Sequence, residues 1–240
     1  MTVVIERRGK VAVLTLSREH RLNALSLQLE QDLLDVLSTS DVTSSRAVVF
    51  TGAGRAFSTG ADVDEVRGLD AAAIAEYYRA SGRVYEAVAG LPQPTVSAVH
   101  GWCLGGGFEL ALATDLRVAD DTAVFGLPEV GLGIVPSSGG LTRLVRMFGT
   151  ARARELVLLG TRVPASDALR LGLVTEVTSV GNDVARAVEL AAKLSAQPAL
   201  AVAVAKQAID AVAESSAAAS LLIERLAYGM LNRVDDERPE

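Results

Sequence analysis

The sequence has few of the residues on which disulfide, metal and histidine chemistry depend. Its 240 residues include one cysteine, Cys103, and two histidines, His20 and His100. A single cysteine excludes an internal disulfide and is typical of a reducing compartment. Because Cys103 stands between Trp102 and Leu104, we expect a small buried side chain rather than a nucleophile. Without clustered acidic ligands to add to the histidines, neither a zinc nor a calcium site is predicted.

Basic patches and long apolar runs are also lacking. The net charge is −6, and no run of Lys and Arg alternates with aromatic residues, which argues against a nucleic-acid-binding protein. Lys206, Gln207 and Asp210 interrupt the alanine-rich stretch 198–213, so no apolar run is long enough to cross a bilayer. The N-terminus lacks the pattern of a signal peptide. We therefore expect a cytoplasmic protein that binds neither nucleic acid nor membranes.

Hydrophobic residues make up 50% of the chain, enough to bury a core without covalent links. Short β-rich runs are predicted at 3–5, 11–16, 47–50, 95–99, 116–119 and 123–125. Amphipathic helices are predicted after Ser26 and over 71–89, where Asp70 precedes the helix and Gly90 ends it. Strands that alternate with helices indicate an α/β domain rather than a sandwich.

The character of the chain changes near residue 181. Segments 182–195, 198–213 and 215–230 are rich in Ala, Leu and Val and are predicted to be helices with no strand between them. We therefore expect a core over residues 1–180 that holds the site and a helical region over residues 181–240. A helical appendage with so much apolar surface is expected to pack on the core or on another subunit.

Two glutamates carry the clearest chemical signal. Glu109 follows the glycines Gly105, Gly106 and Gly107, and Glu129 precedes a second glycine-rich stretch, 131–140. A pair of carboxylates near exposed backbone amides suits acid–base chemistry beside a developing oxyanion. Glu129 taken alone would more simply be a solvated loop carboxylate, and the glycines before Glu109 taken alone could serve only close helix–strand packing. Glu109 opens a predicted apolar helix that continues through 110–113. Its position in the first turn of that helix and the rigid turn at Pro128 favour a functional role.

An earlier glycine-rich segment, 51–62, follows a predicted strand. It does not fit the dinucleotide-binding pattern because Phe57 stands at the third glycine position, and it has no Lys-Ser or Lys-Thr pair for a P-loop. A plain turn is the simplest interpretation of one such loop. Two donor-rich loops after two strands, however, can converge to form a two-amide oxyanion hole.

Serine-hydrolase chemistry is a weaker alternative. His100 and the pair Ser137 and Ser138 stand in glycine-rich contexts, but the chain has no Gly-x-Ser-x-Gly elbow. The hydrolase interpretation is therefore disfavoured.

Several longer segments resemble the crotonase superfamily, the enoyl-CoA hydratases and isomerases. These segments are Arg-Leu-Asn-Ala-Leu-Ser at 21–26, Gly-Arg-Ala-Phe-Ser-Thr-Gly-Ala-Asp at 54–62, and residues 99–111, 115–119, 125–133 and 136–143. They occur in the order typical of the superfamily and span roughly residues 3–200. Their number and length make the resemblance much more specific than a single glycine pattern.

The resemblance implies a crotonase-type α/β spiral of repeated strand-strand-helix units, with C-terminal helices that build a trimer or a dimer of trimers. It implies an acyl-CoA substrate whose thioester oxygen accepts hydrogen bonds from the backbone amides of Ala61 and Gly106. Coenzyme A enters as part of the substrate, so no separate cofactor and no metal are expected. A role in fatty acid metabolism is implied as well.

Members of the superfamily differ in their acid–base residues, and hydratases keep a glutamate at both positions. The resemblance therefore implies an enoyl-CoA hydratase, in which Glu109 holds the attacking water and Glu129 supplies the proton to Cα. An enoyl-CoA isomerase that uses one glutamate and a non-catalytic acyl-CoA-binding relative are the alternatives. The two glutamates together favour hydration.

By position, the resemblance also implies a set of substrate-binding residues. These are Arg21, Leu22, Ala24, Gly60, Ala61, Asp62, Val63, Gly105, Gly106 and Ser137, with Arg21 and Leu22 on the nucleotide side. Segment 63–80, including Val66, Leu69, Ile74 and Tyr77, is expected to shape the acyl pocket.

The chain departs from the superfamily pattern at three places. Segment 17–20 lacks a proline, and Ser137 replaces a glycine beside the catalytic water. Segment 235–240 ends where relatives continue.

Overall fold

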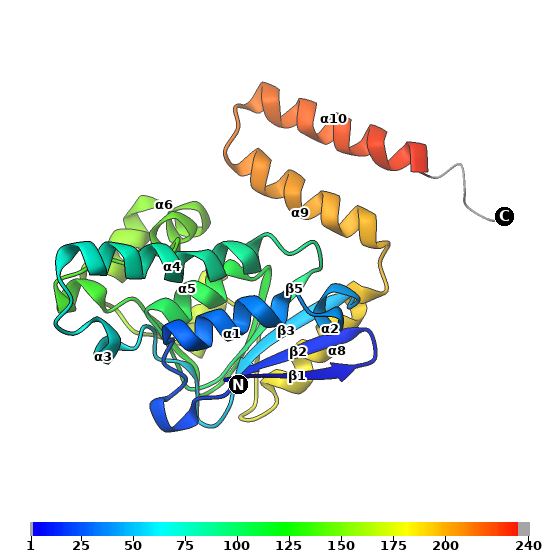
Figure 1. Ribbon diagram of the computed structural model, residues 1–240. Helices are drawn as coiled ribbons and strands as arrows, with labels where there is room; N and C mark the ends of the chain where they lie inside the picture. The colour runs from blue at the N-terminus through cyan, green and yellow to red at the C-terminus, as the bar shows by residue number, and fades with distance from the viewer. Residues whose placement is uncertain (1, 235–240) are drawn as a thin grey trace.

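The computed structural model describes residues 2–234 and contains two β-sheets (Figure 1). The larger sheet has the order β1-β2-β3-β5-β7-β10 and the smaller one the order β4-β6-β8-β9. All neighbouring strands are parallel except the pairs β1–β2 and β8–β9. The strands are β1 (Val3–Arg8), β2 (Val11–Leu16), β3 (Ala47–Gly52), β4 (Ala56–Ser58), β5 (Thr95–Val99), β6 (Trp102–Leu104), β7 (Leu116–Asp120), β8 (Val124–Gly126), β9 (Val163–Pro164) and β10 (Glu176–Thr178).

Ten α-helices and two 3-10 helices occur within residues 2–234. The α-helices are α1 (Leu27–Leu37), α2 (Ser40–Thr43), α3 (Val63–Val66), α4 (Ala71–Ala89), α5 (Gly106–Ala113), α6 (Gly140–Leu158), α7 (Ala165–Leu171), α8 (Asp183–Ser195), α9 (Ala199–Ala213) and α10 (Ala217–Val234). The 3-10 helices are η1 (Glu19–Arg21) and η2 (Glu129–Leu132).

The alternation of side chains along β2 shows how the larger sheet is covered on both faces. Ala12, Leu14 and Leu16 belong to the main core, which also contains residues of α1, α4 and α5. Val11 and Val13 face the opposite way and pack with residues of α8. The sheet is therefore sandwiched between α8 on one face and α1, α4 and α5 on the other (Figure 1).

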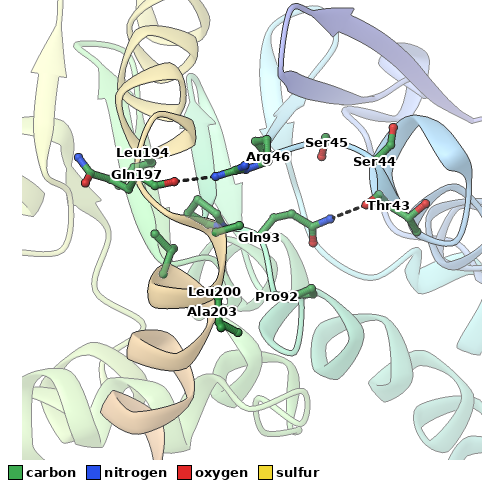
Figure 2. A pocket seen from close by; sticks show the side chains of 13 residues that line it. Thr43, Ser44, Ser45, Arg46, Pro92, Gln93, Leu194, Gln197, Leu200 and Ala203 are labelled. Carbon is green, nitrogen blue, oxygen red and sulfur yellow. Dashed lines mark hydrogen bonds between the residues drawn. The ribbon is translucent and has the colours of Figure 1, made fainter. Parts of the chain in front are cut away.

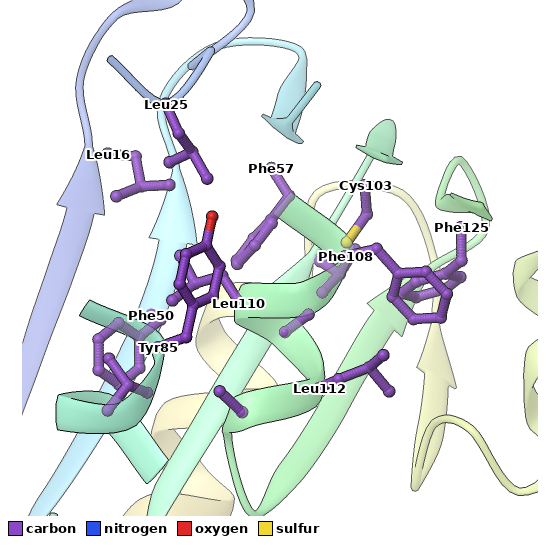
Figure 3. Packing of buried hydrophobic residues seen from close by; sticks show 14 of the residues in the cluster. Leu16, Leu25, Phe50, Phe57, Tyr85, Cys103, Phe108, Leu110, Leu112 and Phe125 are labelled. Atoms are coloured by element: carbon purple, nitrogen blue, oxygen red, sulfur yellow. The ribbon is translucent and has the colours of Figure 1, made fainter. Parts of the chain in front are cut away.

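The main core extends from the sheet to the glycine loop before α5. Figure 3 shows Phe57, Phe108 and Phe125 packed around Cys103, and the Phe108 and Phe125 rings lie 5.5 Å apart. Cys103 is fully buried and free, and burial raises the pKa of its thiol well above the ordinary value. The expectation of a small buried side chain is confirmed.

The predicted helix starts are confirmed by their capping bonds. The Ser26 hydroxyl accepts a hydrogen bond of 3.2 Å from the Leu29 amide, and Asp70 Oδ1 accepts one of 2.9 Å from the Ala73 amide. Each bond satisfies an amide at the first turn that has no partner within its own helix. Helix α4 ends at Gly90 as predicted.

The predicted strand 3–5 is too short, since β1 continues to Arg8 and pairs with Val11 of β2. The hairpin turn is thus confined to Gly9 and Lys10. Helix α8 was expected to belong to the helical region, but Ala187 and Ala191 are fully buried against the sheet. By its packing, α8 belongs with the core.

Helices α9 and α10 form a hairpin that projects from the core (Figure 1). Lys206 ties α9 to the core, since its Nζ lies 2.8 Å from Asp115 Oδ2 and donates to the carbonyls of Leu91 and Gln93. No single helix within residues 2–234 is both long and apolar enough to span a membrane, although the bent pair α8 and α9 passes that test together.

Candidate active site

A cavity of about 100 Å³ brings most of the predicted site residues together. It lies where the loops before α3, α5 and α6 meet η2. Its lining consists of Thr59, Gly60, Ala61, Val63, Val66, Ser81, Tyr85, Gly105, Gly106, Glu109, Pro128, Glu129, Leu132, Ile134, Val135, Ser137 and Ser138. Apolar side chains, exposed backbone and two carboxylates thus converge in one small space, as expected of a ligand site.

The backbone amides of Ala61 and Gly106 lie side by side in this cavity. The Leu25 amide donates to the Gly60 carbonyl at 2.8 Å, and the Leu25 carbonyl accepts from the Asp62 amide at 2.9 Å. Because backbone groups alternate in direction along an extended segment, the Ala61 amide points away from Leu25. Gly106 is the first residue of α5, and its amide has no acceptor within the helix. A Cβ atom on Gly106 would lie 3.6 Å from the Ala61 nitrogen. The two donors can therefore share one oxygen atom.

Glu109 projects from the first turn of α5 toward the start of α6. Its Oε1 accepts hydrogen bonds of 2.8 Å from the amides of Ser138 and Gly140, and the side chain is buried. Burial raises the pKa of Glu109, whereas these amides and the Arg143 guanidinium lower it; the net direction is upward. The carboxylate is held firmly in place by amides at the N-terminus of a helix.

Glu129 begins η2 on the opposite wall, and its environment is less polar. Burial raises its pKa to about 7, with a contribution from the charge of Glu109. Its Oε2 atom has no hydrogen-bond partner among the described residues. A Cβ atom on Gly105 would lie 3.1 Å from Glu129 Oε1, so a side chain at position 105 would crowd the carboxyl group.

Arg143 supports the site but was not predicted from the sequence. It donates a hydrogen bond of 3.0 Å to the Ser138 carbonyl and is half-buried. The guanidinium therefore holds the loop that carries the amides bonded to Glu109. The sequence signal for it was its place at the end of segment 136–143, three residues after the glycine-rich stretch 131–140.

Four of the predicted substrate-binding residues do not line the cavity. Arg21 is exposed and pairs with Asp64 at 2.8 Å, and Asp62 is buried in a 2.9 Å pair with Arg18. Leu22 and Ala24 use their carbonyls to bind other parts of the chain, Leu22 accepting from the Thr59 amide and Ala24 from Arg18. These four residues position the Ala61 loop.

Segment 63–80 contributes less to the cavity than expected. Val63 and Val66 of α3 line it, whereas Leu69, Ile74 and Tyr77 do not. Helix α4 instead presents Ser81 and Tyr85, one and two turns beyond Tyr77, because side chains 3–4 positions apart share a helix face.

His100 is not arranged for serine hydrolysis. Its Nδ1 lies 2.8 Å from Asp183 Oδ2, and this bond is the first of the causes that raise its pKa. Ser137 and Ser138 line the active-site cavity, whereas His100 does not. Within residues 2–234, no three His, Cys, Asp or Glu side chains are grouped to hold a metal ion.

A larger cavity of about 420 Å³ lies where α9 leaves the core (Figure 2). Arg46 spans it and donates a 2.6 Å hydrogen bond to the Gln197 carbonyl. Leu200 and Ala203 line it from α9. Arg46 is its only titratable side chain, so this cavity lacks the groups for acid–base chemistry.

A sequence model of the enoyl-CoA hydratase/isomerase family matches residues 6–238. The chain belongs to this family. The short-chain-enoyl-CoA hydratase of Clostridium acetobutylicum is 35% identical over 98% of this chain and 91% of its own length.

Solved structures agree with this family and with the predicted crotonase fold. The enoyl-CoA hydratase of Bacillus anthracis superposes with a TM-score of 0.92 at 35% identity, over 98% of this chain and 93% of that chain. A Thermobifida fusca protein solved in complex with acetoacetyl-CoA has a TM-score of 0.88 at 30% identity, over 98% and 95%. The α/β fold with a C-terminal helical region is confirmed.

Proposed function

We propose that the protein is an enoyl-CoA hydratase that adds water reversibly to trans-2-enoyl-CoA and gives 3-hydroxyacyl-CoA. The observation that carries this proposal is the convergence of Glu109 and Glu129 on one cavity beside the amides of Ala61 and Gly106. Similarity to proteins named enoyl-CoA hydratases supports it.

In the proposed reaction, the thioester oxygen accepts hydrogen bonds from the amides of Ala61 and Gly106. Water attacks Cβ and forms a new C–O bond, and the π electrons of the double bond move toward the thioester. Negative charge develops on the thioester oxygen, where the two fixed donors stabilise it. The water loses a proton to one carboxylate, and the other carboxyl group protonates Cα.

The unlike environments of the two glutamates support a division of these roles. Burial raises the pKa of Glu109, but its two amide hydrogen bonds oppose this shift and favour the ionised form. Glu109 is therefore the base that orients and deprotonates water. The pKa of Glu129 is raised to about 7 by burial, so a large share of this group carries a proton at neutral pH. Glu129 is therefore the proton donor to Cα.

The decisive experiment follows the loss of conjugated-thioester absorbance when purified protein is mixed with trans-2-butenoyl-CoA. Glu109→Gln and Glu129→Gln are each expected to lower kcat by roughly 10²- to 10⁴-fold, the usual contribution of a general acid or base. Glu189→Gln, an exposed change on α8, is the matched control and keeps full activity. A wild-type protein that binds acyl-CoA but hydrates no chain length contradicts the proposal.

The isomerase alternative predicts a different pattern in the same assay. Only 3-enoyl-CoA substrates would react, and Glu109→Gln would keep that activity. The hydrogen bonds that hold Glu109 in the cavity favour a reaction that uses both carboxylates.

We also propose that the protein assembles as a homotrimer or a dimer of trimers in the cytoplasm and serves fatty acid metabolism. Exposed apolar side chains on the projecting hairpin support the assembly. They are Ile209 of α9 and Leu221, Leu222, Leu226, Tyr228 and Met230 of α10. A face of this kind is rarely left in contact with water.

A further inference from the structure

Tyr85 lies in the wall of the active-site cavity, next to the two amides. It is 2% exposed, and Figure 3 shows its hydroxyl directed toward Leu25. A Cβ atom on Gly106 would lie 2.7 Å from the Tyr85 hydroxyl, 3.4 Å from Leu25 Cδ1 and 3.6 Å from the Ala61 nitrogen. The hydroxyl and both amides therefore surround the same small space.

A buried carboxyl group stands behind Tyr85. Glu30 of α1 is 4% exposed, and its Oε1 accepts a hydrogen bond of 2.8 Å from Ser81 and lies 3.5 Å from the Tyr85 hydroxyl. Its Oε2 has no partner among the described residues. On the cavity side, Ser138 lines the same cavity as Tyr85.

The hydroxyl of Tyr85 has one hydrogen, and Glu30 Oε1 lies within reach as an acceptor. Burial, followed by the charges of Glu30 and Glu109, raises the pKa of Tyr85 well above its ordinary value, so the O–H group keeps its hydrogen. The 3.5 Å separation from Glu30 is long for an O–H···O bond, which is usually near 2.7–2.8 Å. The hydrogen is therefore available to an oxygen atom that enters the cavity.

We propose that the Tyr85 hydroxyl is a third hydrogen-bond donor to the thioester oxygen. Glu30 is then a positioning residue, whose ionised carboxylate draws the hydroxyl hydrogen away from that oxygen. The inference rests on the proposed acyl-CoA substrate but not on hydration. It makes Tyr85 a catalytic residue of the site and explains why a polar pair is buried between α1 and α4.

The protonation of Glu30 decides how the hydroxyl is used. Burial raises the pKa of Glu30 to about 7, while hydrogen bonds from Ser81 and Tyr85 lower it and the charge of Glu65 on α3 raises it. An ionised Glu30 draws the Tyr85 hydrogen toward itself. A protonated Glu30 does not compete as strongly, so the third donor acts below about pH 7 and weakens above it.

Binding of butanoyl-CoA, a saturated thioester that cannot be hydrated, tests this inference by calorimetry. At pH 6, Tyr85→Phe is expected to weaken binding roughly threefold to tenfold, the value of one hydrogen bond. At pH 8 the same change is expected to weaken binding less than about twofold. In a Glu30→Gln background the effect of Tyr85→Phe is expected to be equal at both pH values, because the glutamine does not titrate.

Tyr228→Phe is the control, since Tyr228 is an exposed tyrosine on α10 that does not line the cavity. It is expected to leave binding unchanged at both pH values. Unaltered binding by Tyr85→Phe at pH 6 overturns the third donor. A loss that is equal at pH 6 and pH 8 in the presence of Glu30 overturns the positioning role. Failure of the wild type to hydrate enoyl-CoA leaves this binding test intact, so the two proposals fail separately.

Discussion

At the scale of single residues, a glycine at position 106 leaves open the space in which the thioester oxygen is proposed to bind. The backbone there has a helical conformation that any residue can adopt, since Gly106 is not among the positive-φ glycines. The requirement for glycine is therefore one of space rather than of backbone conformation.

Gly106→Ala is expected to lower hydration by roughly 100-fold or more, the usual cost of one lost oxyanion donor. The new methyl group would stand between the Tyr85 hydroxyl and the Ala61 amide. The melting temperature is expected to fall, because the methyl group would lie 2.7 Å from the hydroxyl of a buried tyrosine, which would have to shift. Gly131→Ala is the matched control, since a Cβ atom there meets no atom within 4 Å. Full activity in Gly106→Ala would contradict the proposed oxyanion site.

Glu30 also has a predicted effect on stability. Because its pKa is raised to about 7 in the folded chain, the folded state keeps this proton to a higher pH than the unfolded state. Stability conferred by the protonated group is thus lost as pH rises from about 4.5 to 7. Glu30→Gln removes this loss and is expected to be more stable than wild type by roughly 1–3 kcal/mol at pH 8, with little difference at pH 4.

Urea unfolding of wild type and Glu30→Gln at the two pH values measures this difference. The exposed change Glu224→Gln on α10 serves as the control and is expected to be neutral. If Glu30→Gln is less stable than wild type at pH 8, the hydrogen bonds of Glu30 stabilise the fold by more than the burial of its charge costs, and the prediction is wrong.

At the scale of secondary-structure elements, a buried ion pair fastens α8 to the core. Asp183 is the first residue of α8 and is 2% exposed, and its carboxylate meets His100 at the end of β5. Asp120 of β7 lies close enough for its charge to add to the raised pKa of His100, and it also binds the Gly181 amide at 2.9 Å. The turn before α8 is therefore held by two carboxylates.

Asp183→Asn is expected to destabilise the protein more at pH 6 than at pH 9. The folded pKa of His100 is raised above its ordinary value of about 6.5, so the folded chain binds this proton more tightly than the unfolded chain. Its contribution to stability is complete below about pH 6.5 and is lost as pH rises through the folded value. Denaturant midpoints at both pH values measure the effect, and Asp121→Asn in the adjacent exposed turn is the control. Equal destabilisation at both pH values would contradict an ionic contribution.

Elements with strong local signals were predictable from the sequence. Helices α1 and α4 carry both an apolar stripe and a capping side chain, and each begins where Ser26 and Asp70 predict. The three-residue strands β4 and β6 were not predicted, because each lies within or beside a glycine-rich segment that is typical of a loop. The elements from α6 to β10 were also missed, since their signals are weak without the core against which they pack.

At the scale of the whole molecule, the projecting hairpin of α9 and α10 exposes apolar side chains that the core does not cover. The chain has a mass of 25.0 kDa, so a trimer is expected at three times that value. The double variant Leu222→Glu, Leu226→Glu is expected to shift the protein toward the single-chain mass in analytical ultracentrifugation, because charge at a buried apolar contact is costly. Gln207→Glu on α9 is the control. A wild-type protein that sediments as a single chain at all concentrations contradicts the proposed assembly.

The sites of chemistry were predictable from the sequence, but their environments were not. Glu109, Glu129, Ala61 and Gly106 are brought to one cavity as expected. Arg21 and Leu22, which were expected on the nucleotide side, do not line this cavity. Tyr85 and Arg143 were overlooked, since neither is marked by glycine or by helix-capping chemistry.

The sequence by itself determined the local structure and the kinds of reacting groups, because periodicity, caps and glycine loops act over a few neighbouring residues. Only the tertiary structure decided which groups share an environment. Glu30 and Tyr85 are 55 positions apart, and they meet because α1 packs on α4. Glu109 binds the start of α6, whereas Glu129 stands in a less polar wall. Burial and hydrogen bonding, which set these pKa values, exist only after the chain has folded.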